Sequence, residues 1–364
     1  MATITANPYV QKLVPYVAGK PIEEVERELG ITNIIKLASN ESPLGPSPKA
    51  LEAATKAMEG LRMYPEGSCY VLRRAAAEHL GVPEDWLMFG NGSDNLLHCL
   101  GIAFLQDTDD VVTANPTFVQ YRAAARLAGA NLVEVPLVDY KYDLDALADH
   151  FSDKTRIVFI ANPNNPTGTM NTRAEVERLI GRLPERTLLV LDEAYCEYVD
   201  DPAYPDSLQY VRDGLNVVVL RTFSKIYALA GLRVGYGIAR PDIVKIIDQV
   251  REPFNVNTVA QYAAAASLAD TEHVKKNREL NRRGKEQFCS VFQEIGLSYA
   301  ASQANFVFVD LGRDAVEVSN ELMRRGVIIR PGNIFGTPTC ARITIGTDEE
   351  NGRFLSELVD ILRH

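Results

Sequence analysis

Between residues 86 and 238 the chain alternates short apolar runs with helical patterns, and this alternation limits the fold more than any other feature. The runs are nearly continuous in apolar residues, which is typical of strands buried on both faces of a sheet. Helical patterns between strands favour parallel pairing, with helices on both faces. The sequence therefore predicts an α/β fold with a mostly parallel seven-stranded sheet, whose strands are expected at 86–89, 110–114, 132–135, 156–161, 188–191, 217–220 and 234–238.

The pattern changes after Pro241, where helical segments dominate as far as residue 296. Three strand-like runs follow at 305–309, 327–330 and 341–345, and an amphipathic helix is expected over 349–362. Residues 1–46 are rich in proline and are expected to be irregular. A chain of 364 residues is longer than a single hydrophobic core usually supports, so we expect two domains. These are a large domain over 47–250 and a smaller α+β domain over 251–364, which the N-terminal strap 1–46 joins.

Lys225 follows the apolar run 217–220 after only four residues, a position where a charged side chain is poorly tolerated. Most lysines are solvated surface charges, but a desolvated lysine loses its proton easily and becomes an amine nucleophile. Such an amine can hold an aldehyde as a Schiff base. We therefore interpret Lys225 as the lysine that carries pyridoxal phosphate (PLP), and the rest of the chain has to supply that cofactor's other partners.

Two further strands end in residues that PLP chemistry requires. Asp192 ends the run 187–191, and a carboxylate there can keep the pyridine nitrogen protonated. Tyr195 follows three residues later and can hydrogen-bond the phenolic oxygen of the ring. Asn165, held extended by Pro166, can donate to the same oxygen and can also reach the substrate. Taken alone, Asp192 fits a helix cap or an ion pair equally well, and Asn165 fits a structural turn.

The segment 87–97 reads as a strand, a glycine turn and a helix start. Free backbone N–H groups at a helix N-terminus form an anion site, and we assign Gly92, Ser93 and Asp94 to the cofactor phosphate. Ser224 and Arg233 flank Lys225 and can complete this site. The segment lacks the Gly-Lys-Ser/Thr end of a nucleotide-binding P-loop and the third glycine of a dinucleotide fingerprint.

Four residues are candidates for the ring face and for an anionic substrate. Phe118, at a helix start, can stack on a planar ring, although a core position fits it as well. Arg330 and Arg342 each lie beside an apolar run and suit an anionic group, with surface salt bridges as the alternative. Tyr16, in the N-terminal strap, can reach the same site.

The composition excludes several classes of partner. The net charge is −10, and there is no basic block, which argues against nucleic acid and anionic membranes. The five cysteines have no metal-ligand or redox spacing, so no metal is expected. Neither a signal peptide nor a run long enough to span a bilayer is recognised. We expect a cytoplasmic protein that acts on small molecules.

Three motifs together resemble the fold-type-I PLP aminotransferases of class II. The segment 222–231 is similar to their lysine signature, although Ile226 replaces the usual small residue. The segments 162–168 and 191–195 are similar to their asparagine and aspartate–tyrosine motifs. The resemblance extends over essentially the whole chain and implies a PLP-dependent transaminase.

Within that family, the segments 15–25, 37–45 and 64–66 are most similar to the histidinol-phosphate aminotransferases. This closer resemblance implies an obligate homodimer in which Tyr64 reaches the PLP phosphate of the neighbouring subunit. It also implies that Arg330 and Arg342 bind the substrate's phosphate or carboxylate, with Tyr16 nearby. The implied reaction belongs to histidine biosynthesis: imidazole acetol phosphate and L-glutamate give L-histidinol phosphate and 2-oxoglutarate.

Three alternatives stay open from the sequence. An aromatic amino-acid aminotransferase would use the same chemistry with a phenylalanine or tyrosine donor. A PLP-dependent decarboxylase would share the fold. A PLP-sensing regulator would require an added DNA-binding domain, and residues 1–46 are too short and too rich in proline for one.

Overall fold

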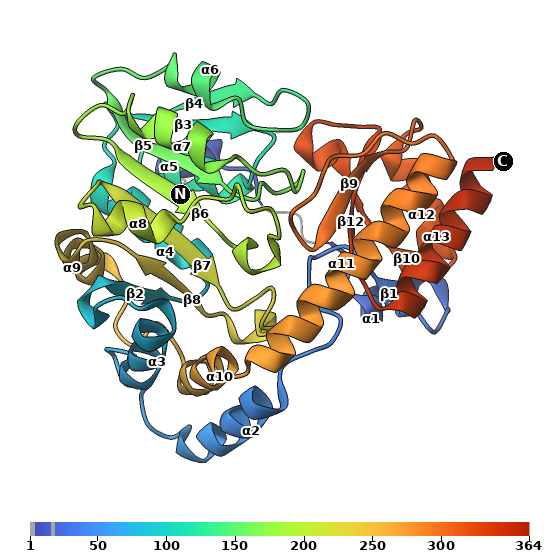
Figure 1. Ribbon diagram of the computed structural model, residues 1–364, viewed down its shortest axis with the longest axis horizontal. Helices are drawn as coiled ribbons and strands as arrows, with labels where there is room; N and C mark the ends of the chain where they lie inside the picture. Colours follow the sequence, from blue (N-terminus) through green and yellow to red (C-terminus); the bar gives the residue numbers. More distant parts are fainter. Residues whose placement is uncertain (1–3, 16–18, 364) are drawn as a thin grey trace.

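The computed structural model of the chain describes residues 4–15 and 19–363. Its larger part is built on a seven-stranded sheet in the order β2-β8-β7-β6-β5-β3-β4 (Figure 1). β8 runs antiparallel to both of its neighbours, and the other pairs are parallel, which confirms the predicted mostly parallel sheet. The strands are β2 (Leu87–Gly90), β3 (Asp110–Asn115), β4 (Asn131–Pro136), β5 (Thr155–Ala161), β6 (Leu188–Asp192), β7 (Val217–Thr222) and β8 (Gly235–Ile238).

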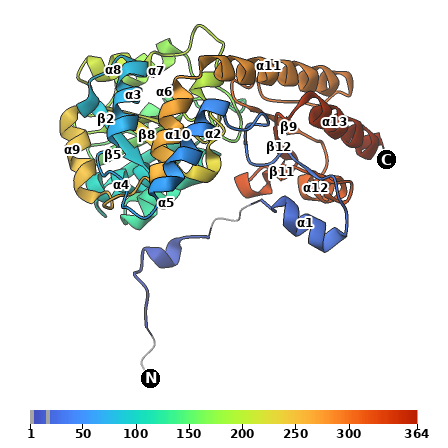
Figure 2. The same ribbon diagram turned by 90° about the horizontal axis from the view of Figure 1, so that it is seen from below.

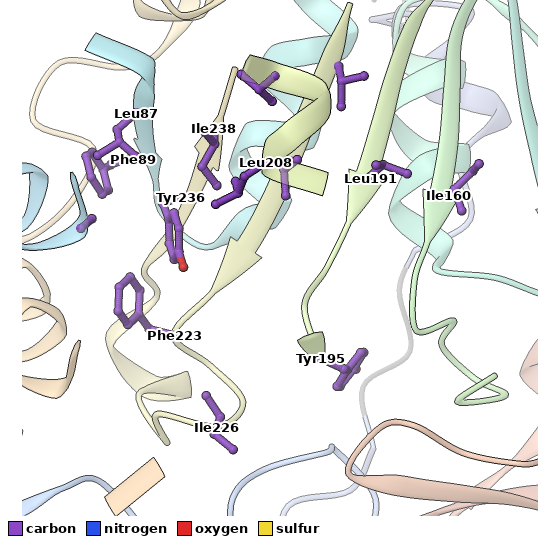
Figure 3. Close-up of a cluster of buried hydrophobic side chains, with 14 of the residues drawn as sticks. Leu87, Phe89, Ile160, Leu191, Tyr195, Leu208, Phe223, Ile226, Tyr236 and Ile238 are labelled. Atoms are coloured by element: carbon purple, nitrogen blue, oxygen red, sulfur yellow. The ribbon is translucent and has the colours of Figure 1, made fainter. Parts of the chain in front are cut away.

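The sheet separates two apolar cores, because successive strand residues point to opposite faces. In β7, Val217 and Val219 belong to one core, and Val218 and Leu220 belong to the other. Figure 3 shows side chains of the first core gathered beside the strands. Helices α2 (Pro48–Ala57), α3 (Tyr70–Leu80), α6 (Leu144–Ala148), α7 (Arg173–Ile180), α8 (Ser207–Arg212) and α10 (Thr258–Leu268) contribute to the first core, and α4 (Ser93–Phe104), α5 (Val119–Leu127) and α9 (Pro241–Val250) contribute to the second.

The smaller part of the molecule contains two small sheets covered by helices (Figure 1). β11 (Arg330–Pro331), β12 (Cys340–Thr344) and β9 (Phe306–Asp310) form an antiparallel sheet, and β1 (Ile35–Lys36) pairs in parallel with β10 (Val327–Ile328). Its own apolar core includes Phe288, Phe354 and Ile343. The helices are α11 (Thr271–Glu294), α12 (Ala315–Arg324) and α13 (Asp348–Arg363).

The expectation that residues 1–46 are irregular is wrong for two segments, which form helix α1 (Ile22–Leu29) and the two-residue strand β1. Pro21 stands at the N-cap, where a missing N–H costs nothing, so here proline marks a helix start and not a break. Helices α8 and α12 were also not expected from the sequence. The division at residue 250 stays a prediction. Helix α10 lies beyond residue 250 in the sequence, but it packs against α2 and α3 of the larger part.

The N-terminal segment lies outside the sheets. Its 3-10 turn η1 (Val10–Lys12) packs against α5, and the hydroxyl of Tyr9 donates to Oδ2 of Asp107 at 3.3 Å. The N-terminal end of the described chain projects from the body of the molecule (Figure 2). In the described ranges, no helix combines the length and the apolar character that crossing a membrane requires.

Candidate active site

A cavity of about 190 Å³ lies at the carboxyl ends of β5, β6 and β7. Residues of β11 and β12 and the segment 38–40 line its other side, so both parts of the molecule contribute to it. Ligand sites of open α/β sheets lie at this edge. The structure brings together in this cavity the predicted residues Ser93, Asp94, Phe118, Asn165, Asp192, Tyr195, Ser224, Lys225, Arg233, Arg330 and Arg342.

Lys225 lies in a tight turn that follows β7. The turn is closed by backbone hydrogen bonds from Ala228 to Lys225 and from Leu229 to Phe223. The ammonium group of Lys225 donates to the carbonyl oxygen of Ser39 at 3.3 Å. Burial, and secondarily the charge of Arg342, lowers the pKa of Lys225 to about 8. A substantial fraction of this amine is therefore neutral and nucleophilic near physiological pH.

Asp192 is the last residue of β6, and only 4% of it is exposed. The hydroxyl of Tyr121 donates to its Oδ2 at 2.8 Å, and the backbone N–H of Ala194 donates to its Oδ1 at 3.3 Å. Burial raises the pKa of Asp192 to about 6, and the bond from Tyr121 opposes that rise. A carboxylate that has lost its water in this way gains from a cationic partner in the cavity.

The N-terminus of α4 faces the cavity beside Arg233. The N-cap Gly92 has a φ of 78°, and a Cβ at this position would lie 2.5 Å from Nη2 of Arg233. A Cβ on Gly235 would lie 2.4 Å from the backbone nitrogen of Ser93, so glycine lets β8 approach the helix start closely. Arg233 reaches Oδ2 of Asp94 at 3.4 Å and Oγ of Ser224 at 3.5 Å. The helix dipole and the guanidinium together form an anion site.

Arg330 and Arg342 lie side by side on β11 and β12, where they are register partners. Each is 7% exposed. Arg342 donates to the side-chain oxygen of Asn165 and to the carbonyl oxygen of Ala38, both at 2.6 Å. Two buried guanidinium groups concentrate positive charge at this end of the cavity, which favours a phosphate or a carboxylate there.

Aromatic residues line the remaining walls. Phe118, the N-cap of α5, packs edge-on against Tyr121, whose ring stacks on Phe159 at 4.9 Å. Tyr195 is 4% exposed, and its ring lies 5.7 Å from the ammonium group of Lys225. Phe118 and Tyr195 therefore border the cavity from two directions.

Two predicted site residues do not line the cavity, and a third cannot be compared. Gly92 does not line the cavity, but it caps the helix whose first residues do. Tyr64 lies outside the cavity; it is 82% exposed and stacks on Phe254 at 5.0 Å. Tyr16 lies outside the described residues.

The profile of the family "Aminotransferase class I and II" matches residues 32–358. The chain belongs to the class I and II aminotransferases. It is 49% identical over 354 residues to the histidinol-phosphate aminotransferase of Moorella thermoacetica, covering 97% of this chain and 92% of that one. It is 50% identical over 357 residues to the histidinol-phosphate aminotransferase of Anaeromyxobacter sp., with 98% of each chain covered.

A solved aminotransferase structure has the same architecture. Histidinol-phosphate aminotransferase from Sinorhizobium meliloti, in complex with pyridoxal-5'-phosphate, superposes with a TM-score of 0.91 at 32% identity. The alignment covers 100% of this chain and 98% of that one. The predicted fold type is thereby confirmed.

Two residues of this aminotransferase site were missed by reasoning from the sequence. Tyr121 bonds Asp192 directly, and its position three residues after Phe118 places the two on one helix face, a spacing that could have indicated it. Asn40 lines the cavity and bonds the hydroxyl of Tyr195. Asn40 stands in an irregular segment, and only the tertiary contacts single it out. No metal-binding group of three or more histidine, cysteine or acidic side chains was found among the described residues.

Proposed function

We propose that this aminotransferase catalyses PLP-dependent transamination between imidazole acetol phosphate and L-glutamate, giving L-histidinol phosphate and 2-oxoglutarate in histidine biosynthesis. The observation that carries the proposal is the convergence of Lys225, Asp192 and the Arg330–Arg342 pair on one cavity. The relatives that share about half of their residues with this chain over nearly full length bear the same activity in their names.

The residues present fit PLP. A phosphate suits the start of α4 with Arg233, because Gly92 lets the guanidinium of Arg233 lie directly against the N-terminus of this helix. A protonated pyridine nitrogen suits the buried carboxylate of Asp192. The aldehyde of PLP suits the amine of Lys225, because the lowered pKa of this amine keeps part of it neutral. Phe118 would cover one ring face, and Asn165 and Tyr195 would bond the phenolic oxygen.

When bound, PLP supplies an aldehyde that links to the substrate amine and a protonated ring that withdraws electrons from the neighbouring carbon. Lys225 acts as the proton carrier, since a neutral amine at Nζ can accept the proton from that carbon and return it one position away. Asp192 holds the ring proton and keeps the ring cationic. Tyr121 keeps the carboxylate of Asp192 oriented at 2.8 Å.

The two arginines provide the common anion site for both substrates. L-glutamate carries a carboxylate that histidinol phosphate lacks, whereas histidinol phosphate carries a phosphate. We propose that Arg330 and Arg342 bind the phosphate of histidinol phosphate in one half-reaction and a carboxylate of L-glutamate in the other. A guanidinium can form two parallel hydrogen bonds with either group. Their burial, at 7% exposure each, strengthens this attraction. Tyr16 is proposed to join them.

A half-reaction assay tests the proposed substrate. The PLP-loaded protein is mixed separately with histidinol phosphate, L-glutamate and L-phenylalanine, and the visible absorbance is followed in a stopped-flow instrument. We expect histidinol phosphate and glutamate to convert the enzyme at least ~10-fold faster than phenylalanine, which has neither the phosphate of histidinol phosphate nor the side-chain carboxylate of glutamate. Fast conversion by phenylalanine and none by histidinol phosphate would instead identify an aromatic amino-acid aminotransferase.

We further propose a cytoplasmic homodimer. All five cysteines are free, which fits a reducing compartment. Large apolar side chains are exposed around α2 and α10, which pack against each other (Figure 2). Exposed apolar patches of this kind mark protein interfaces. The exposed apolar residues on and near these two helices are Leu51, Met58, Leu61, Met63, Tyr64, Phe254 and Tyr262.

Subunit mixing tests whether Tyr64 serves the neighbouring site. We expect Tyr64→Ala to weaken PLP binding about 10-fold by removing one bond to a phosphate, and Tyr64→Phe to do the same while it keeps the apolar surface. Tyr64→Ala and Lys225→Ala chains are then unfolded together and refolded with limiting PLP. Each mixed dimer would contain one site with both native residues, so activity should recover to roughly a quarter of the wild-type value. If no mixing ratio of the two variant chains restored activity, the proposal that both subunits contribute to each site would be contradicted.

A further inference from the structure

Asn40 is a buried polar residue that reaches the cavity from an irregular segment. It is 1% exposed, and its side-chain Nδ2 donates to the hydroxyl oxygen of Tyr195 at 2.9 Å. We propose that Asn40 is a positioning residue that sets the direction in which the Tyr195 hydroxyl donates its proton. The inference rests on the proposed function, because the acceptor in the cavity would be the phenolic oxygen of PLP.

The orientation of the Asn40 amide is determined by Thr344 of β12. The backbone N–H of Asn40 donates to Oγ1 of Thr344 at 2.9 Å, so the threonine's own proton has to point elsewhere. That hydroxyl donates to Oδ1 of Asn40 at 3.1 Å. Since Oδ1 is engaged by Thr344, the amide presents its Nδ2 donor to Tyr195.

This arrangement decides the role of the Tyr195 hydroxyl. A phenolic hydroxyl carries one proton and can both donate and accept. Because its oxygen accepts from Asn40, its proton is left to point away from Asn40, toward the cavity that Tyr195 lines. With only 4% of Tyr195 exposed, bulk water does not compete for that proton. A donor aimed at a negatively charged oxygen stabilises the deprotonated form and lowers the pKa of the group that shares the proton.

The smaller part of the molecule holds this segment in place at several points. Nδ2 of Asn305 donates to the carbonyl oxygen of Asn40 at 3.0 Å, and Arg342 donates to that of Ala38. Between them, the carbonyl oxygen of Ser39 accepts from Lys225. The direction of the Tyr195 proton is thus tied to the position of β12, which also carries the anion-binding Arg342.

A purely structural role is the competing explanation. Asn40 has a φ of 57°, a backbone conformation that asparagine adopts more readily than most residues. Glycine adopts it even more readily, so Asn40→Gly keeps the backbone conformation and removes the side chain with its amide. Asn40→Asp keeps the shape and replaces the donor with an acceptor.

The test is a pH titration of the visible absorbance of the PLP-loaded protein, together with thermal unfolding. We expect the pH midpoint to rise by about one unit in Asn40→Gly and by at least as much in Asn40→Asp. Thr344→Val should shift the pH midpoint in the same direction. If the Asn40 variants do not fold, the inference is tested with this variant instead. In a Tyr195→Phe background, the Asn40 substitutions should add no further shift.

Ser42→Ala is the matched control, because it frees the same segment from Asn277 of α11 without touching the cavity. Its midpoint should equal that of the wild type. An unmoved midpoint in the Asn40 variants, a shift that persists without the Tyr195 hydroxyl, or an equal shift in Ser42→Ala would each overturn the inference alone. A wild-type protein that takes up no PLP would overturn the proposed function and this inference with it.

Discussion

Replacing Lys225 with alanine is expected to lower the turnover number by about 10⁴-fold or more, since proton transfer by a positioned amine supplies up to this factor. Among the described residues that line the cavity, Lys225 is the only lysine, so the variant loses the proposed proton carrier. Steady-state rates with histidinol phosphate and 2-oxoglutarate measure the loss. The visible absorbance of the PLP-loaded variant should also differ from that of the wild type, because the amine that holds the aldehyde is gone.

Two controls separate chemistry from folding. Lys245→Ala removes an exposed lysine of α9 and should leave the turnover number unchanged. Added methylamine should restore part of the activity of Lys225→Ala, because a small amine can enter the vacated space and carry the proton. Residual turnover within 10-fold of the wild-type value would sink the assignment of Lys225.

The large sheet was predictable because each strand is apolar on both faces. The runs at 157–160 and 217–220 show this pattern without reference to any partner strand, and both are almost completely buried. In the smaller part, β9 and β12 match the runs expected at 305–309 and 341–345, and β10 and β11 lie within or next to the run at 327–330. β1 carries no such signal. It has two residues and pairs with β10, which lies almost 300 residues later in the sequence, so its formation depends on tertiary packing and not on local pattern.

The residues of the candidate site also differ in how far the sequence predicts them. Asp192 ends a buried strand, and Asn165 and Lys225 lie in the turns that follow two others. Parallel topology brings such strand ends to one edge of the sheet. Asn40 has no comparable signal, because its partners Tyr195 and Thr344 lie far away in the sequence. The roles assigned to these residues stay predictions, which the substitutions described above test.

Replacing Asp192 with asparagine is the second change with a large expected effect. The amide keeps the shape of the side chain but cannot hold a proton on the ring nitrogen. Breaking a buried charge pair costs about 3–5 kcal/mol, so we expect the turnover number to fall by roughly 10²–10⁴-fold. Stopped-flow half-reactions should place this loss in the step that removes the proton from the substrate carbon, and a fall smaller than ~5-fold would contradict the role of Asp192.

The pH dependence of cofactor binding gives an independent test of Asp192. Its pKa in the ligand-free protein is raised to about 6, mainly by burial. Above this pH the carboxylate is ionised and can pair with a protonated ring; as the pH falls through 6, a proton on Asp192 competes with that pairing. PLP affinity of the wild type should therefore decrease below pH 6, and Asp192→Asn should lose this dependence.

Tyr121→Phe provides the matched control for this pH test. It keeps the carboxylate of Asp192 but removes the hydroxyl that donates to Oδ2. That hydrogen bond lowers the pKa of Asp192 against the effect of burial, so its loss should raise the pKa further. The fall in PLP affinity should then begin at a higher pH than in the wild type, opposite to its disappearance in Asp192→Asn. Equal pH profiles for all three proteins would show that another group controls cofactor binding.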